Sequence, residues 1–174
     1  MENGVIVYRN MPSPLGEMIA GATSKGICFL EWYDRSSVEK ILNRVAKRYK
    51  TELQPGNNVH LDLLERELDN YFKGKLKDFT VPIDVTGTAF EMAAWKQLLK
   101  IPYGETRSYG QLAGFLGKPK ASRAVGRANG ANYLSIVIPC HRVIETNGKL
   151  GGYGGKLWRK KRLLELENNQ AKLI

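Results

Sequence analysis

The pattern of this sequence changes at Thr86-Gly87, and this change limits the possible folds more than any other feature. Before it, short runs of alternating apolar and polar residues are separated by turn-forming residues and predict β-strands at 4–9, 17–22 and 26–32. After it, helical patterns predominate. We therefore predict a mixed α/β (α+β) fold with two parts. Residues 1–86 form an N-terminal lobe with a small antiparallel sheet plus helices, and residues 87–174 form a mostly helical C-terminal lobe.

Helix starts are marked by capping boxes, in which Ser or Thr is followed three residues later by Glu or Gln. Ser36 and Glu39 form such a pair before an amphipathic run that ends at Tyr49. A second helix is expected over residues 59–72, followed by an extended run at 79–85. In the second lobe, capping boxes at Thr88 and Ser108, a break at 117–120 and the positions of leucines predict four further helices. Their expected ranges are 88–99, 109–116, 121–130 and 157–167.

The remaining segments of the second lobe are shorter. Residues 134–138 are mostly apolar and predict a buried strand that ends at Pro139. Asn147-Gly148 is a strong two-residue turn signal, so residues 143–150 predict a small hairpin. Residues 168–174 are expected to be a frayed tail.

Charge is distributed unevenly between the two halves. Residues 1–87 carry 12 Lys and Arg against 12 Asp and Glu, whereas residues 88–174 carry 15 against 5, so the whole net charge of +10 lies in the second half. A basic half on a neutral half predicts a face that binds a polyanion such as nucleic acid, and the alternative is a solvated surface. No apolar run is long enough to span a bilayer, and the N-terminus lacks the apolar block of a signal peptide. We therefore expect a cytoplasmic protein without membrane contact.

Two short helices joined by a tight glycine-containing turn, at 109–116 and 121–130, are typical of a helix-turn-helix, although many helical hairpins share this pattern. The second of them is rich in Ala, Ser and Gly, and small residues allow its backbone to approach another surface closely. Arg123 and Arg127 lie four residues apart and therefore on one face. This composition favours a helix that lies against a nucleic-acid groove, with Arg as the side chain that inserts.

The chain has two cysteines and two histidines, which do not make a disulfide scaffold or a structural zinc site. Cys28 lies inside an apolar run and is interpreted as a small core residue. Cys140 directly precedes His141, and a thiol needs a base or a cation nearby to act as a nucleophile. An acid that orients the histidine would complete a Cys-His-acid arrangement. The acidic residues of the second half are the candidates: Glu91, Glu105, Glu145, Glu165 and Glu167.

Two features of this region leave alternatives open. Adjacent residues of a strand point to opposite sides, so Cys140 and His141 need a bridging water or a turn at Pro139 to be connected, and an inert buried cysteine is the alternative. Residues 151–155, GGYGG, lack the Gly-Lys-Ser/Thr ending of a P-loop. We interpret them as the wall of a pocket, in which backbone N–H groups lie close to a planar ligand.

These motifs together resemble the O6-alkylguanine-DNA alkyltransferases. The resemblance is strong over residues 84–167 and is carried by IPCHRV at 138–143, GETRSY at 104–109, SRAVG at 122–126 and GYGG at 152–155. Residues 1–83 resemble only the variable N-terminal lobe of that family, through SPLG at 13–16.

The resemblance implies a role for individual residues. Cys140 resembles the alkyl acceptor, His141 the base that draws its proton through a water, and Glu167 the acid that orients this base. Asn132 resembles the hinge that ties the DNA-binding helix to the active site. Tyr109 resembles the residue that turns the target nucleotide and donates a hydrogen bond to the guanine, and Arg123 the finger that fills the vacated stack. DNA contacts are expected from Ala121, Ser122 and Arg127. Val143 and the Cys140 carbonyl resemble acceptors for the guanine amino group, and Tyr153, Gly154 and Gly155 complete the substrate pocket.

The implied activity is direct-reversal DNA repair. Such a protein transfers an alkyl group from O6-alkylguanine, or also from O4-alkylthymine, to its own cysteine once per molecule, as a monomer on double-stranded DNA and without a cofactor or a metal. One departure stands out: Tyr133 follows Asn132 where the family usually has Pro, which frees φ and predicts a looser hinge. The rival interpretations are a lesion-binding module without transfer, against which Cys140 argues, and a cysteine hydrolase.

Overall fold

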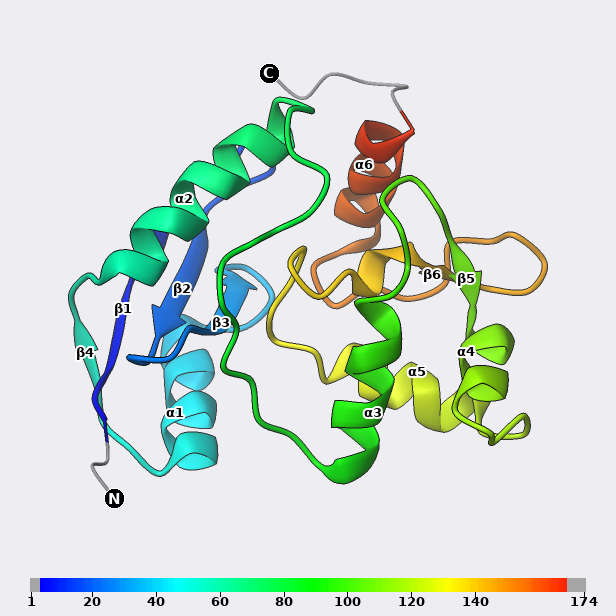
Figure 1. Cartoon of the computed structure of the whole chain (residues 1–174), viewed down its shortest axis with the longest axis horizontal. Helices are drawn as coiled ribbons and strands as arrows, with labels where there is room; N and C mark the ends of the chain where they lie inside the picture. The colour runs from blue at the N-terminus through cyan, green and yellow to red at the C-terminus, as the bar shows by residue number, and fades with distance from the viewer. Residues whose placement is uncertain (1–3, 169–174) are drawn as a thin grey trace. The chain divides into compact units, whose positions relative to one another are not determined.

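The computed structural model describes residues 4–168. These residues group into two compact units, the first ending at Thr86 and the second beginning at Gly87 (Figure 1). Within residues 4–168, no helix combines the length and the apolar character that crossing a membrane requires. Each unit is described below by itself.

The first unit contains a four-stranded sheet with the order β3-β2-β1-β4. Strands β1, β2 and β3 pair antiparallel, whereas β4 pairs parallel with β1. All residues of β2 and β3 are buried, so these strands form the centre of the core. The three-residue strand β4 had no counterpart among the sequence-based predictions. The strands are β1 (Ile6–Met11), β2 (Met18–Ala22), β3 (Ile27–Trp32) and β4 (Leu53–Pro55).

Two helices complete the first unit, α1 (Val38–Tyr49) and α2 (Val59–Phe72), and both lie where the apolar spacing predicted them. The cap of α1 corrects the sequence analysis: Ser37, not Ser36, is the N-cap, and its side chain accepts a hydrogen bond from the Lys40 amide. Helix α2 packs against β2 and β3 (Figure 1).

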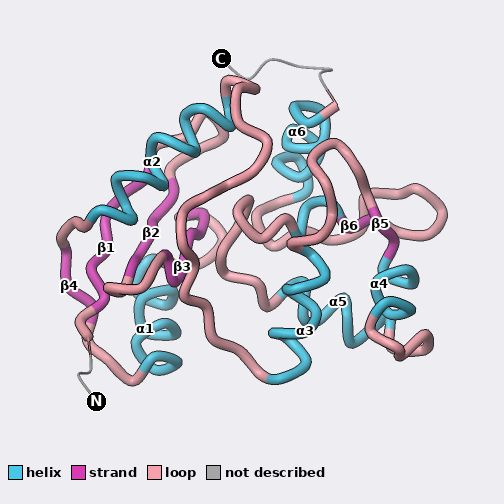
Figure 2. The backbone as a smooth tube through the Cα atoms, viewed as in Figure 1, coloured by secondary structure: helices cyan, strands magenta, loops and turns pink. Residues whose placement is uncertain are grey.

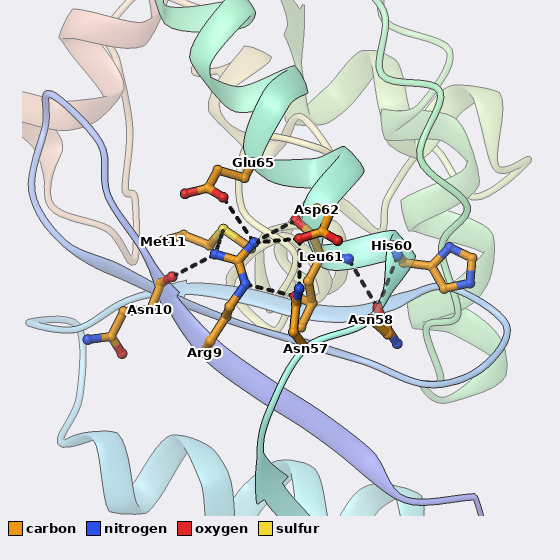
Figure 3. A network of polar contacts seen from close by, with 9 residues as sticks. All are labelled: Arg9, Asn10, Met11, Asn57, Asn58, His60, Leu61, Asp62 and Glu65. Carbon is orange, nitrogen blue, oxygen red and sulfur yellow. Dashed lines mark hydrogen bonds and ion pairs between the residues drawn. The ribbon is translucent and has the colours of Figure 1, made fainter.

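Arg9 links strand β1 to helix α2 through a network of polar contacts (Figure 3). Its guanidinium lies 3.0 Å from a Glu65 oxygen and 3.5 Å from an Asp62 oxygen, and its Nε donates to the Asn57 side chain over 3.0 Å. The Arg9 side chain is 24% exposed, and the two carboxylates are about half exposed. Such partly exposed pairs stabilise a fold only modestly.

Glu67 holds the segment that leads out of the first unit. This buried carboxylate on α2 accepts hydrogen bonds from the backbone amides of Thr80 and Val81. The segment 79–85 was predicted to be extended, and it contains no strand beyond a single parallel bridge between Ile27 and Ile83. The Glu67 carboxylate and two backbone hydrogen bonds to Ile27 therefore hold this segment in place of regular strand pairing.

The second unit consists of short helices separated by long loops (Figure 2). Helices α3, α4 and α5 pack on one another. Strands β5 and β6 pair parallel. Capping boxes are present at Thr88 and Ser108, as predicted. The elements are α3 (Ala89–Leu98), β5 (Arg107–Ser108), α4 (Tyr109–Phe115), α5 (Ser122–Gly130), a 3-10 helix η1 (Cys140–Arg142), β6 (Val143–Ile144) and α6 (Leu157–Glu167).

Two predictions for this unit were wrong. Residues 134–138 form successive buried turns instead of a strand: Ile136 has φ 71°, and the Ile138 amide donates to the Leu134 carbonyl. Residues 143–150 do not form a two-stranded hairpin, because β6 pairs with β5 while residues 145–149 close a turn. The predicted turn at Asn147-Gly148 lies inside it, with Gly148 at φ 82°. Of the predicted tail, residues 169–174 lie outside the described residues.

Candidate active site around Cys140

Cys140 is the first residue of η1 and is 4% exposed. Its amide donates to the Ile138 carbonyl over 2.8 Å, and the Arg142 amide donates to the Pro139 carbonyl over 3.0 Å. The cysteine therefore sits on a tight turn after Pro139. Because this turn is not a strand, the expectation that Cys140 and His141 point to opposite sides of a sheet does not apply.

His141 and Glu167 form a buried pair. The His141 Nε2 lies 2.7 Å from Glu167 Oε1, and both side chains are 0% exposed. The structure thus brings together the histidine and one of the five acids that the sequence left as candidates. The other ring nitrogen, Nδ1, is buried and has no hydrogen-bond partner among residues 4–168. This nitrogen remains available for a proton that comes from elsewhere.

Arg142 completes the charge arrangement around Glu167. Its Nε lies 2.9 Å from Glu167 Oε2, its Nη2 lies 3.0 Å from Oε1, and its Nη1 donates to the Ile101 carbonyl over 2.7 Å. Burial acts to raise the pKa of the Glu167 carboxyl, but His141 and Arg142 outweigh it and hold that pKa well below its usual range. Glu167 is therefore ionised and able to fix the orientation of the imidazole.

Asn132 ties the end of α5 to the turn that carries the cysteine. Its Nδ2 donates to the Ile138 carbonyl over 3.0 Å, and its Oδ1 accepts from the Leu134 amide over 3.0 Å. Tyr133 is 3% exposed, and its ring meets the Trp95 ring edge to face with centroids 5.6 Å apart. The large side chain that replaces the usual Pro is thus packed in the core of this unit.

Tyr109, the first residue of α4, has its ring between two glycines. A Cβ at Gly126 on α5 would lie 3.9 Å from the ring, and a Cβ at Gly151 would lie 3.2 Å from the hydroxyl oxygen. Burial is the main cause that raises the pKa of Tyr109, followed by the charges of Cys140 and Glu145. The phenol is therefore neutral and able to donate its proton in a hydrogen bond.

Lys160 is a fully buried cation near the cysteine. Its Nζ donates to the Val143 carbonyl over 2.5 Å and to the Gly152 carbonyl over 3.1 Å. Burial lowers the pKa of Lys160 to about 8, and the charges of Cys140 and Glu145 partly oppose this shift. The ammonium thus connects β6 to the glycine-rich loop and places positive charge close to Cys140.

The structure places the remaining predicted residues in two groups. Arg123 and Arg127 are exposed on α5, and the helix begins at Ser122 with Ala121 as its N-cap residue, one position later than expected. These residues lie on the helix surface and are not part of the buried cluster around Cys140. The predicted pocket residues vary in exposure: Val143 and Gly155 are buried, Tyr153 is half-buried and Gly154 is exposed.

Sequence reasoning assigned no role to Arg142, Lys160 or Asn129. Arg142 entered only as part of the IPCHRV motif at 138–143. Lys160 was not singled out, although it lies three residues before Leu163 and therefore on the buried face. Asn129 donates from its Nδ2 to the Cys140 carbonyl over 3.2 Å. No local pattern marks it, because its partner is 11 residues away.

Two family models match the chain over most of its length. Residues 6–85 match the model described as 6-O-methylguanine DNA methyltransferase, ribonuclease-like domain. Residues 89–169 match the model described as 6-O-methylguanine DNA methyltransferase, DNA binding domain.

Individual proteins are similar to the chain over nearly its whole length. The methylated-DNA--protein-cysteine methyltransferase of Mycobacterium tuberculosis is 41% identical over 167 residues, which cover 96% of this chain and 95% of the relative. The inducible enzyme of Bacillus subtilis with the same name is 42% identical over 150 residues, or 86% and 83% of the two chains. The crystal structure of Mycobacterium tuberculosis OGT in complex with DNA superposes with a TM-score of 0.81 at 42% identity, covering 95% and 94%.

Proposed function

Because this chain belongs to the 6-O-methylguanine DNA methyltransferase family, we propose that its Cys140 is the residue that accepts the alkyl group. The activity is direct-reversal DNA repair by alkyl transfer, that of a methylated-DNA–protein-cysteine methyltransferase. The observation that carries the assignment to Cys140 is the buried cluster of His141, Glu167 and Arg142 that begins one residue after it.

The cluster generates the nucleophile. Only about 3% of an ordinary thiol is ionised at neutral pH, so the cysteine needs a base. The Nδ1 of His141 takes the Cys140 proton through a water, while Glu167 holds Nε2 and stabilises the imidazolium that forms. Lys160 adds a nearby positive charge that favours the thiolate.

DNA enters along α4 and α5, which act as the helix-turn-helix. A base inside a duplex is out of reach, so the nucleotide has to be flipped out, at a cost of a few kcal/mol. Ala121, Ser122 and Arg127 contact the minor groove, where the small residues of α5 permit close approach. Arg123, exposed on α5, fills the space that the flipped base leaves.

The flipped guanine is held by backbone and aromatic groups. The carbonyls of Cys140 and Val143 accept hydrogen bonds from its amino group, and Tyr153, Gly154 and Gly155 form the pocket wall. Tyr109 donates to the guanine and stabilises the charge that develops on it. Asn132 keeps this arrangement in register with α5.

The chemical step is an in-line displacement. The Cys140 sulfur forms a bond to the alkyl carbon as the carbon–oxygen bond to O6 breaks, and the electron pair passes to the guanine, which takes up a proton. The product is a thioether, which has no carbonyl for water to attack, so each molecule reacts once. This step needs no cofactor and no metal. The substrate is alkylated guanine in double-stranded DNA, with O4-alkylthymine as a second candidate, and the protein acts in the cytoplasm as a monomer.

The mass of the intact protein tests this proposal. After incubation with a duplex that contains O6-methylguanine, we expect a gain of one methylene, which maps to Cys140 in a peptide digest and saturates at one equivalent. The Cys140→Ala variant should still bind the duplex but gain no mass. Tight lesion binding by the wild-type protein without a mass change would instead identify a lesion-binding module.

A second measurement tests the role of Arg123. Arg123→Ala should slow repair of duplex DNA by about tenfold or more and affect transfer from the free base O6-benzylguanine much less, because the free base leaves no gap in a stack. An equal loss with both substrates would contradict the proposed insertion.

A further inference from the structure

Asn129 is a buried polar residue on α5 to which the proposed chemistry assigns no task. Its side chain is 8% exposed, and its Nδ2 donates to the Cys140 carbonyl oxygen over 3.2 Å. Its Oδ1 is also buried and has no hydrogen-bond partner in the described part of the chain. Burying an amide is unfavourable unless its hydrogen bonds are made, so a polar residue at this place calls for an explanation.

Tyr109 lies along the same face of α5. Its ring is in contact range of Gly126, which precedes Asn129 by three residues, and residues three apart share one face of a helix. Burial, followed by the charges of Cys140 and Glu145, raises the pKa of Tyr109, and the Asn129 side chain lies close enough to the hydroxyl to oppose this increase. The Asn129 amide is therefore bonded to the Cys140 carbonyl and lies on the face of α5 that the Tyr109 ring covers.

One amide group has the donors to serve both partners. An asparagine Nδ2 carries two hydrogens, of which one is directed at the Cys140 carbonyl. The second is available to the Tyr109 hydroxyl oxygen. A hydroxyl that accepts a hydrogen bond on its oxygen keeps its own proton for another acceptor.

We infer that Asn129 is a positioning residue that holds the Cys140 carbonyl and the Tyr109 hydroxyl in a fixed relation to each other. Both groups contact the flipped guanine in the proposed function, on which this inference rests. The Asn129 amide on α5 thus fixes the positions of two groups that contact the base. Asn132 has other partners as well, since it holds the Ile138 carbonyl and the Leu134 amide.

Kinetics of methyl transfer test this inference. Asn129→Leu preserves the approximate volume of the side chain and removes its hydrogen bonds. We expect methyl transfer from duplex O6-methylguanine to slow about tenfold, the effect of losing one well-placed hydrogen bond. Asn70→Leu changes an exposed asparagine on α2 and serves as the matched control, with an unchanged transfer rate. A wild-type rate for Asn129→Leu would overturn the inference.

A double-mutant cycle distinguishes positioning from a general loss of structure. Once Tyr109→Phe has removed the hydroxyl, Asn129→Leu should slow transfer by less than about threefold, because only the contact to the Cys140 carbonyl remains to be lost. If the fold-changes in transfer rate of the two substitutions simply multiply in the double variant, Asn129 does not act through Tyr109 and the inference is wrong.

A spectroscopic measurement covers the case in which Asn129→Leu does not fold. In the folded protein, Tyr109→Phe should shift the NMR signals of the Asn129 side-chain amide, whereas Tyr8→Phe in the first unit should not. Unshifted Asn129 signals would overturn the inference. The failure of the proposed function is a separate result, since it would appear as a wild-type protein that takes up no methyl group whatever the Asn129 signals do.

Discussion

Each unit of this protein has a buried carboxylate on a helix. The partners of the first carboxylate are mainly backbone amides, and those of the second are side chains. Glu67 on α2 accepts hydrogen bonds from the Thr80 and Val81 amides, which are neutral. Glu167 on α6 is paired with His141 and Arg142. The first carboxylate fastens a loop to a helix, and the second holds an imidazole and a guanidinium next to the turn that carries Cys140. A buried carboxylate that faces backbone amides thus stabilises the fold, whereas one that faces a histidine and an arginine suits the proposed reaction.

The two cysteines repeat this contrast. Cys28 is fully buried in β3, where burial and the charge of Asp84 raise the pKa of its thiol far above the usual range. Cys140 is almost as buried, but it lies on a turn beside His141 and near Lys160. Burial alone therefore does not distinguish Cys28 from Cys140, the proposed nucleophile, whereas the surrounding charges do.

The largest effect is expected from substituting the two cysteines in parallel. Cys140→Ser should abolish methyl uptake, because a serine hydroxyl is hardly ionised near neutral pH. Cys28→Ser should leave uptake per folded molecule unchanged and lower only the stability, because it buries a hydroxyl in the core. Intact-protein mass spectrometry and urea denaturation measure these outcomes. Methyl uptake by Cys140→Ser at another residue would contradict the assignment of Cys140 as the acceptor.

The next effect comes from the paired carboxylates. Glu167→Gln should slow transfer by about a hundredfold or more and lower the free energy of unfolding by roughly 3 kcal/mol, since Arg142 loses its buried partner. Glu67→Gln should lower the free energy of unfolding by about 1–3 kcal/mol through the loss of charge-assisted hydrogen bonds and leave transfer per folded molecule unchanged. Single-turnover kinetics and urea denaturation distinguish the two. Slower transfer in folded Glu67→Gln would show that the units do not divide these tasks.

The helix caps follow from local patterns, and the buried turns do not. The capping boxes at Thr88 and Ser108 could be predicted because all their atoms lie within four residues. Residues 134–138 could not be assigned correctly, since an apolar run is compatible with a buried strand or with buried turns. The positive φ of Ile136 is favoured only by the packing around it.

The buried position of Lys160 could have been predicted from the sequence, but its hydrogen bonds could not. Lys160, Leu163 and Glu167 lie three and four residues apart, which places the lysine on the buried face of α6. Its hydrogen bonds to the Val143 and Gly152 carbonyls were not accessible, because both loops are irregular and approach it only in the folded chain. The resemblance named Cys140, His141 and Glu167, and the structure adds the groups that surround them.

The contribution of the buried cation Lys160 to stability should depend on pH, whereas that of an exposed lysine should not. The folded-state pKa of Lys160 is about 8, below the ordinary value of about 10.4 for the unfolded chain. Between these values the unfolded chain binds more protons, so the stability of the wild type should rise with pH relative to Lys160→Met, by up to about 1.4 kcal/mol per pH unit. Urea denaturation from about pH 8 to about pH 10 measures this. The control Lys161→Met, at a side chain 67% exposed, should show no such trend.

The smallest effect is expected at Arg9. Its pairs with Asp62 and Glu65 are partly exposed, so Arg9→Met should lower the free energy of unfolding by about 1 kcal/mol or less (Figure 3). Transfer per folded molecule should not change. Urea denaturation and single-turnover kinetics provide the measurement, and slower transfer would assign the first unit a part in the reaction.

The second unit divides its cations between surface and interior, since Arg123 and Arg127 are exposed whereas Arg142 and Lys160 are buried. Dissolved salt screens exposed charges strongly and buried charges weakly. Ionic strength therefore separates the two stages of repair. Added salt should weaken the encounter with DNA, with a logarithmic slope of about 0.9 per phosphate contact, while the rate at saturating DNA stays nearly constant. The slope of DNA affinity against salt concentration thus gives the number of phosphates that the surface of this protein neutralises.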